Sequence, residues 1–177
     1  PWAALTAAAM VLICVGRMAA ADRYLRQARQ ALKQKLFGPA VYCFEAATRL
    51  VPWEMRYLAA YNQFLIKYSS RAGSPQQRID MLKRAARLGQ RAVDWHPNEA
   101  GSHHMFGLSL WAAGRAGAPQ HLTKAETALA RGAELDPYFL PILKAHRLVL
   151  KDLGDTGKRR EVEARIGAIQ KLLTSRQ

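Results

Sequence analysis

Cysteine and acidic residues are scarce in this sequence. The 177 residues include two cysteines, and 13 aspartates and glutamates stand against 27 lysines and arginines. Cys14 lies in an apolar run and Cys43 on the predicted packed side of a helix, so we expect two free, small hydrophobic side chains rather than a disulfide framework. The formal net charge of +14 and a pI near 10.4 permit nucleic acid, anionic lipid or acidic peptides as partners.

Strand patterns and catalytic motifs are also missing. No window alternates apolar and polar residues between turn dipeptides, which predicts an all-helical chain. There is no GxSxG elbow, no cysteine–histidine arrangement in a familiar context and no pair of carboxylates in an apolar setting. The stretch GDTGK at 154–158 is too short for a phosphate loop, and Arg159 stands where Ser or Thr should bind magnesium.

The five histidines show no ligand spacing. His103 and His104 are adjacent, so on a helix their side chains point about 100° apart and do not form the paired-ligand geometry of an HExxH zinc site. His96, His121 and His146 add no further pattern. We therefore predict no catalytic residue, no cofactor and no metal in this chain.

A long apolar stretch opens the sequence. Residues 1–16 carry no charge before Arg17, and the chain continues to Leu36 with only Gly16 as a helix breaker. We predict one long helix in which residues 1–20 form a membrane anchor, since the alanines after Arg17 lengthen the apolar part and arginine can snorkel. A helix in the core of an assembly and an ordinary buried helix are the alternatives. Pro1 and Trp2 do not supply the basic start of a secretory signal, and the missing initiator Met leads us to expect a segment upstream.

Three segments further along repeat one design. In each, a small residue stands five positions before a proline and another stands twelve before it. The near positions are Ala47, Ala92 and Gly132, the far positions are Ala40, Ala85 and Ala125, and the prolines are Pro52, Pro97 and Pro137. Self-similarity at a period of tens of residues predicts stacked units rather than one mixed core.

These positions resemble the tetratricopeptide repeat (TPR), a helix–turn–helix unit of about 34 residues. The third unit is the clearest, with Phe106-Gly107, Leu110 and Gly114 in the first helix before Ala125, Leu129, Gly132 and Pro137. The resemblance implies an all-α, TPR-like α-α superhelix over residues 21–177, with units of about 21–52, 53–97, 98–137 and 138–173 and with insertions near 69–76 and 114–120. The residues expected to hold the helix crossings and unit ends are Ala40, Ala47, Pro52, Ala92, Pro97, Gly107, Ala125, Gly132 and Pro137.

Helix limits follow from breakers and caps. We expect helices at about 40–50, 53–70 and 76–95, the last capped by Ser74, then one capped by Asn98, one ending before Pro137, one running through Leu150 and a last, capping helix at 158–173. The resemblance implies a concave surface lined by the first helix of each unit. Its expected partner-binding residues are Arg29, Lys33, Asn62, Ile66, His104, Leu108, Trp111, Lys144, Leu148 and Lys151.

The predicted helix 76–95 is the most basic one. Its basic patch consists of Arg78, Lys83, Arg84, Arg87 and Arg91. A solvated helix face accounts for such a patch, and an anionic partner or lipid headgroups are the functional alternatives. Aromatic residues interleaved with the charges, which nucleic-acid binding would favour, are lacking.

Three functions compete at this stage. The first is a non-catalytic, membrane-tethered scaffold that binds a protein or peptide, possibly an acidic one. An apolar helix that leads into TPR-like repeats is similar to the C-terminal part of some bacterial O-antigen ligase and polymerase family members, which implies repeats outside the cytoplasm and catalysis, if any, in other segments. The second is a pilin-like subunit of a filament or oligomer whose apolar helices form the core. The third is a soluble, basic adaptor for nucleic acid.

The sequence does not decide on which side of the membrane the repeats lie. The excess of Lys and Arg after the apolar segment favours the cytoplasm, but long domains cross membranes largely regardless of charge. We place the anchor in a bacterial inner membrane with the repeats on the periplasmic or extracellular side.

Overall fold

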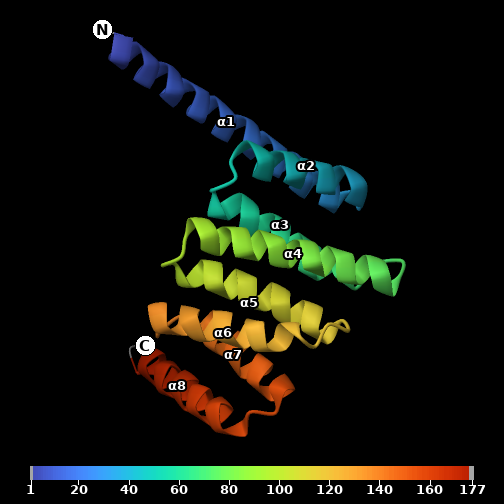
Figure 1. The fold of residues 1–177 in the computed structure, drawn as a ribbon, viewed down its shortest axis with the longest axis vertical. Helices are drawn as coiled ribbons and strands as arrows, with labels where there is room; N and C mark the ends of the chain where they lie inside the picture. The colour runs from blue at the N-terminus through green and yellow to red at the C-terminus, as the bar shows by residue number, and fades with distance from the viewer. Residues whose placement is uncertain (1, 176–177) are drawn as a thin grey trace. The chain divides into compact units, whose positions relative to one another are not determined.

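The computed structural model describes residues 2–175 and contains eight helices and no strand over that range (Figure 1). The helices are α1 (Trp2–Lys33), α2 (Phe37–Leu50), α3 (Met55–Ser69), α4 (Pro75–Trp95), α5 (Ala100–Arg115), α6 (His121–Leu135), α7 (Leu140–Leu153) and α8 (Thr156–Thr174). The predicted all-helical class and the long apolar N-terminal helix are confirmed. The chain divides into two compact units, one ending at Tyr61 and the other beginning at Asn62 within α3.

In the first unit, α1 packs against α2 over its C-terminal half only. Ala21, Leu25 and Ala28 of α1 are buried, whereas the side chains described between Trp2 and Met18 are exposed. A three-residue connection reverses the chain after Lys33, with Lys35 in the left-handed region at φ 61°. Figure 1 shows the N-terminal half of α1 extending past the end of α2.

In the second unit, consecutive helices pack as layers from α4 to α8, and α5 also contacts α7. The core contains Leu110 of α5, Leu129 of α6 and Ile142, Leu143 and Val149 of α7, all buried. Val162, Ile166 and Ile169 of α8 cover the same core. The helix α8 buries only one side of its surface and has a charged outer face, as capping helices of stacked repeats do.

The three proline-terminated helices end in the same way. The residue before each proline donates its N–H to the carbonyl of the small residue four positions earlier: Val51 to Ala47 at 3.2 Å, His96 to Ala92 at 2.8 Å and Asp136 to Gly132 at 3.0 Å. A residue that precedes proline is pushed out of the α region, and these three have φ near −133° and positive ψ. The sequence repeat is therefore also a repeat of helix ends.

Two details of the helix limits differ from expectation. Ser74 caps α4 as predicted, since its Oγ accepts the Gln77 N–H at 3.2 Å. Asn98 does not cap α5, however, because the N-cap is Glu99, without a side-chain cap bond. The Ser102 hydroxyl donates towards the carbonyl oxygens of His96 and Glu99, 2.7 Å from each, and so bridges this turn. The connections at 70–74 and 116–120 coincide with the predicted insertions, and α4 is longer than α2 or α6.

Candidate partner-binding face of α5 and α7

The first helices of the third and fourth predicted repeats, α5 and α7, are direct neighbours. The His104 ring meets the Phe139 ring edge-on, with centroids 5.5 Å apart. Trp111 Nε1 donates to Asp152 Oδ2 at 2.7 Å. Both contacts advance in the same direction along the chain, so the two helices run parallel. We refer to the surface formed by His104, Leu108, Trp111, Lys144, Leu148 and Lys151 as the α5/α7 face.

Trp111 is fixed at the centre of this face. Its ring is partly buried against the core of the second unit. The Arg115 guanidinium carbon lies 5.5 Å from the ring centroid, which is a cation–π distance. Arg115 Nε is also 3.7 Å from the Asp152 oxygen that accepts from the indole. The indole orientation is therefore set by a hydrogen bond and a stacked cation, and Arg115 compensates the charge of Asp152.

Apolar and cationic groups flank the tryptophan. Leu108 is partly buried against the core, while Leu148 is 37% exposed. Lys144 and Lys151 are exposed on α7. Next to them, Arg147, Leu148, Lys151, Arg159 and Glu163 line a depression of about 330 Å³ between α7 and α8. Three cations against one carboxylate make this end of the face positive.

The α5/α7 face offers charge, hydrogen bonds and apolar contact. Burial lowers the pKa of His104, so this imidazole is neutral near pH 7 and packs against Phe139. Among residues 2–175, no three His, Cys, Asp or Glu side chains gather in a way that would hold a metal ion. These properties suit recognition of a partner segment.

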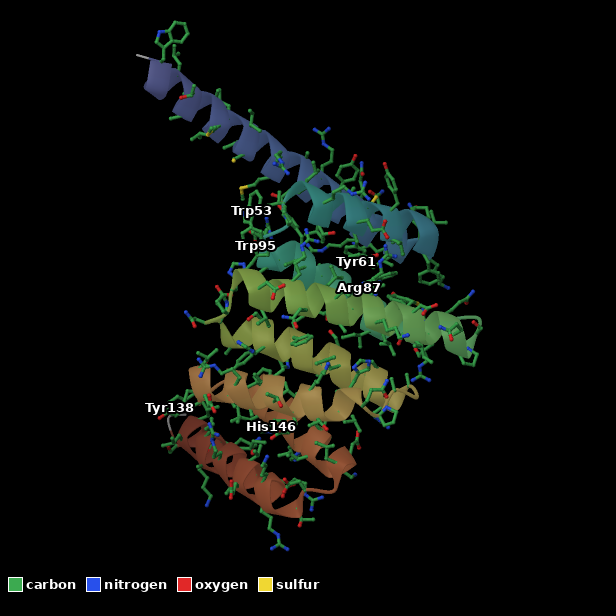
Figure 2. The ribbon with its side chains drawn as sticks, in the orientation of Figure 1. Trp53, Tyr61, Arg87, Trp95, Tyr138 and His146 are labelled. Atoms are coloured by element: carbon green, nitrogen blue, oxygen red, sulfur yellow. The ribbon has the colours of Figure 1, made fainter. Side chains whose placement is uncertain are left out.

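His146 is a buried titratable group outside the face. Figure 2 labels it on α7, and its Nε2 is 3.6 Å from Glu126 Oε1 of α6. Lys158 of α8 binds the same carboxylate oxygen at 3.0 Å. Burial lowers the pKa of His146 more than the nearby Glu126 carboxylate raises it. This cluster connects α6, α7 and α8, so we assign it to folding stability and not to partner binding.

Four of the predicted partner-binding residues do not belong to the α5/α7 face. Asn62 is buried, and its amide nitrogen donates to the Ala85 carbonyl at 2.8 Å and to Ser109 Oγ at 2.7 Å. It is thus an internal cross-link between helices and not a surface contact, which corrects the prediction. Ile66 is half-buried on α3, and Arg29 and Lys33 are exposed on α1 in the other unit. Their part in partner binding stays a prediction.

The small residues predicted at helix crossings are all enclosed. Ala40, Ala47, Ala92 and Ala125 have no exposed surface. A Cβ on Gly107 would lie 2.5 Å from Leu129 Cγ, and one on Gly132 would collide with Ile142 Cδ1. Pro52 is half-buried, and Pro97 and Pro137 are exposed at the unit ends.

The basic patch lies along α4. Arg78, Lys83 and Arg87 are exposed, whereas Arg84 and Arg91 are half-buried. Gln76 and Gln90 bind Asp80 and Asp94 at 3.0 and 2.9 Å, so carboxylates are interleaved with the cations. Trp95, 53% exposed, stands at the end of the helix. Binding of an anionic partner here stays a prediction.

Three residues that contact or adjoin the α5/α7 face were not predicted from the sequence: Arg115, Arg147 and Asp152. A signal for two of them was present. Arg115 follows Trp111 by four positions, which places the two on one helix side. Asp152 is the acidic residue of an otherwise basic and apolar α7 sequence. Only the packing of α7 against α5 brings Asp152 to the indole.

Comparison with known proteins identifies a fold but no sequence family. No family model matches the sequence, and neither does any curated protein. Solved structures do match. TTC0263, a thermophilic TPR protein of Thermus thermophilus, aligns with 86% of this chain and 75% of its own at a TM-score of 0.64 and 18% identity.

YrrB, described as a TPR protein with an unusual peptide-binding site, aligns with 86% of this chain and 70% of its own at a TM-score of 0.61 and 20% identity. MamA aligns with 88% of this chain and 80% of its own at 0.55 and 16% identity. The fold is TPR-like. At these identities the likeness concerns the fold alone, and the predicted TPR-like class is confirmed at that level.

Proposed function

We propose that this protein is a non-catalytic, membrane-tethered scaffold that binds a segment of a protein partner on the α5/α7 face. The observation that carries the proposal is the fixed Trp111 indole between exposed lysines and aliphatic side chains. TPR-like folds suit such a role because their first helices present a continuous surface. The peptide-binding site named for YrrB supports the same type of ligand.

The chemistry of the face selects the partner. Lys144, Lys151 and Arg147 favour a segment with Asp or Glu side chains, while Trp111 and Leu148 favour an aliphatic anchor. Trp is the residue type most enriched where binding energy concentrates. An acidic peptide with a central Leu, Ile or Val therefore meets both requirements.

The test uses the full chain in detergent micelles and synthetic twelve-residue peptides graded in acidic and aliphatic content. Fluorescence anisotropy gives each Kd. We expect binding to acidic, aliphatic peptides and a loss of about tenfold or more for Trp111→Ala, since each factor of ten corresponds to about 1.4 kcal/mol. Undiminished binding by Trp111→Ala would exclude the α5/α7 face.

A charge-matched control is available on another helix. The single change Lys151→Ser should weaken acidic peptides more than their amidated Asn/Gln counterparts. Lys124→Ser removes an exposed lysine from α6 and should leave the affinity unchanged. Equal losses in both variants would mean that only the net positive charge attracts the peptide.

The tether rests on α1. Its segment Leu5–Lys33 is long and apolar enough to cross a membrane, with a mean hydropathy of 1.6 in its most apolar window and 6% of that window buried. Signal sequences satisfy the same criterion of length and hydropathy, but a buried core helix does not show such exposure. The test is carbonate extraction of membranes that contain the protein. Release of the protein into the soluble fraction without detergent would contradict the tether.

The exposed apolar half of α1 also favours a second function, the pilin-like subunit. Apolar helices from many copies would then cover one another in a filament core. Long fibres by negative-stain microscopy after detergent removal would establish the filament, whereas vesicle-bound single copies would establish the tether. Retention on heparin that falls steeply with salt would instead favour the nucleic-acid adaptor.

We further propose a bacterial inner membrane with the repeats outside the cytoplasm, as the resemblance to O-antigen ligase and polymerase family members implies. Protease digestion of intact spheroplasts is the test. Loss of the repeat domain supports this side, and protection until lysis contradicts it.

A further inference from the structure

The apolar half of α1 is exposed around its whole circumference. The side chains of Trp2, Met10, Leu12, Ile13 and Val15 range from 58% to 79% exposed. A helix that is apolar on every side needs an apolar medium on every side, not a groove on one. Residues 2–16 cover about 22 Å at the helical rise of 1.5 Å per residue. A lipid bilayer is such a medium, and this length covers about three-quarters of its roughly 30 Å hydrocarbon core.

The end of the apolar segment is marked by an arginine and a tryptophan from different elements. Arg17 is the first charged residue of α1. Trp53 belongs to the connection between α2 and α3, and the Arg17 guanidinium carbon lies 5.9 Å from its ring centroid. Figure 2 labels Trp53 beside α1. Tryptophan and arginine are the side chains that gather at the boundary between acyl chains and headgroups.

The one acidic residue in the α1 sequence, Asp22, is neutralised close to this point. It lies about 7.5 Å further along the helix by the same rise per residue. Arg56 binds its carboxylate at 2.8 Å, and the Tyr57 hydroxyl donates to the same oxygen at 2.9 Å. Phosphates near Arg17 would therefore meet a compensated carboxylate, and the exposed Arg23 and Arg26 add positive charge to the next turns of the helix.

From these contacts we infer that Arg17 and Trp53 form a phospholipid headgroup site that sets the depth of α1 in the bilayer. The Arg17 guanidinium binds a lipid phosphate, and the Trp53 ring lies at the boundary between headgroups and acyl chains. The inference rests on the membrane tether proposed above and adds the level at which the protein leaves the membrane.

The test compares two single-tryptophan versions of the full chain in vesicles of phosphatidylcholine and phosphatidylglycerol. One keeps Trp2, the other keeps Trp53, and the remaining tryptophans are Phe. Lipids brominated near the headgroup or near the acyl-chain ends quench fluorescence by depth. We expect shallow bromines to quench Trp53 most, whereas Trp2, about 22 Å along α1 from Arg17, should be quenched by deep bromines as well.

The outcomes separate the two claims. Deep quenching of Trp2 with no quenching of Trp53 keeps the tether and overturns the headgroup site. No quenching of either overturns the tether itself. Arg17→Ala should abolish the shallow preference of Trp53. Arg29→Ala, on the same helix about 18 Å further along at 1.5 Å per residue, is the matched control and should leave it unchanged; an equal effect of both variants would contradict a specific Arg17 contact.

A second measurement keeps all four tryptophans and so does not depend on how the Phe substitutions fold. Cys14 is exposed, whereas Cys43 is buried and burial raises the pKa of its thiol, so a maleimide dye reacts selectively at Cys14. Cys14 stands three positions before Arg17. We expect shallow bromines to quench this dye in the original chain and deeper ones in Arg17→Ala. An unchanged depth would overturn the inference.

Discussion

At the scale of single residues, glycines set how closely neighbouring helices approach. The closest approach to a backbone atom involves Gly89 of α4, where an added Cβ would lie 2.6 Å from Phe106 Cα of α5. A side-chain tip can rotate away from such a contact, but a backbone atom moves only with its helix. Gly107 and Gly132, which the sequence repeat predicts, face side-chain atoms of Leu129 and Ile142 instead. The crossing that side-chain movement alone cannot relieve is therefore at a residue outside the repeat pattern.

Gly89→Ala should destabilise the second unit. Overpacking of a tight joint costs about 1–3 kcal/mol, which exceeds the roughly 1 kcal/mol that alanine gains over glycine in a helix. Gly167→Ala is the control, because Gly167 lies in α8 with no atom near its Cβ position. Urea denaturation should show a lower midpoint for Gly89→Ala and an equal or higher one for Gly167→Ala. A stabilised Gly89→Ala would contradict the close packing.

His146 should make folding stability depend on pH. Its pKa is lowered in the folded chain, mainly by burial, with Glu126, Lys158 and Arg165 facing it. The unfolded chain binds a proton near pH 6.5, so the stability is present above that pH and is lost as pH falls through the lower folded pKa. The slope approaches about 1.4 kcal/mol per pH unit for one proton. His104 has the same sign and adds to it.

The measurement is Tm between pH 7.5 and 5.5. The original chain should lose stability towards acid, and His146→Gln should lose less over the same range. Identical slopes would mean that His146 binds its proton equally well in both states.

At the scale of elements, helix-breaking residues and helical periodicity predicted where the helices lie. Capping side chains predicted only some of the helix ends. Pro52, Pro97 and Pro137 end their helices because proline restricts the residue before it. Ser74 caps α4 as a serine before proline suggests. Asn98 has equally good local chemistry, but the helix begins one residue later, with Glu99 at the N-cap position. Which of two adjacent polar residues takes the N-cap position is not visible in the order of residues.

Removal of the cap at α4 should be measurable. Ser74→Ala should cost about 1 kcal/mol, the usual loss for an N-cap serine. Asn98→Ala should change the free energy of unfolding far less, since Asn98 is exposed and makes no cap bond. Chemical denaturation of both variants gives the comparison. A larger loss for Asn98→Ala would restore it as the cap of α5.

At the scale of the whole molecule, we expect the exposed apolar half of α1 to govern solubility. The side chains described within residues 2–16 are exposed, and the core of the second unit contains none of them. Deleting residues 1–16 should therefore leave helix content and peptide affinity nearly unchanged while removing the need for detergent. Light scattering after size exclusion is the readout. A full chain that stays monodisperse without detergent would contradict both the tether and the filament.

The helical class, the three repeat ends and the long apolar start could be predicted from the order of residues, because each depends on a local rule: helical periodicity, proline at helix exits or uninterrupted apolar residues. Which polar groups face solvent depended on how the helices pack. Asn62 was predicted to line the groove, but its buried amide donates hydrogen bonds to Ala85 and Ser109. Asp152 was not predicted, because only the packing of α7 on α5 brings it to Trp111. Those outcomes depend on contacts between residues more than 20 positions apart, which no local pattern specifies.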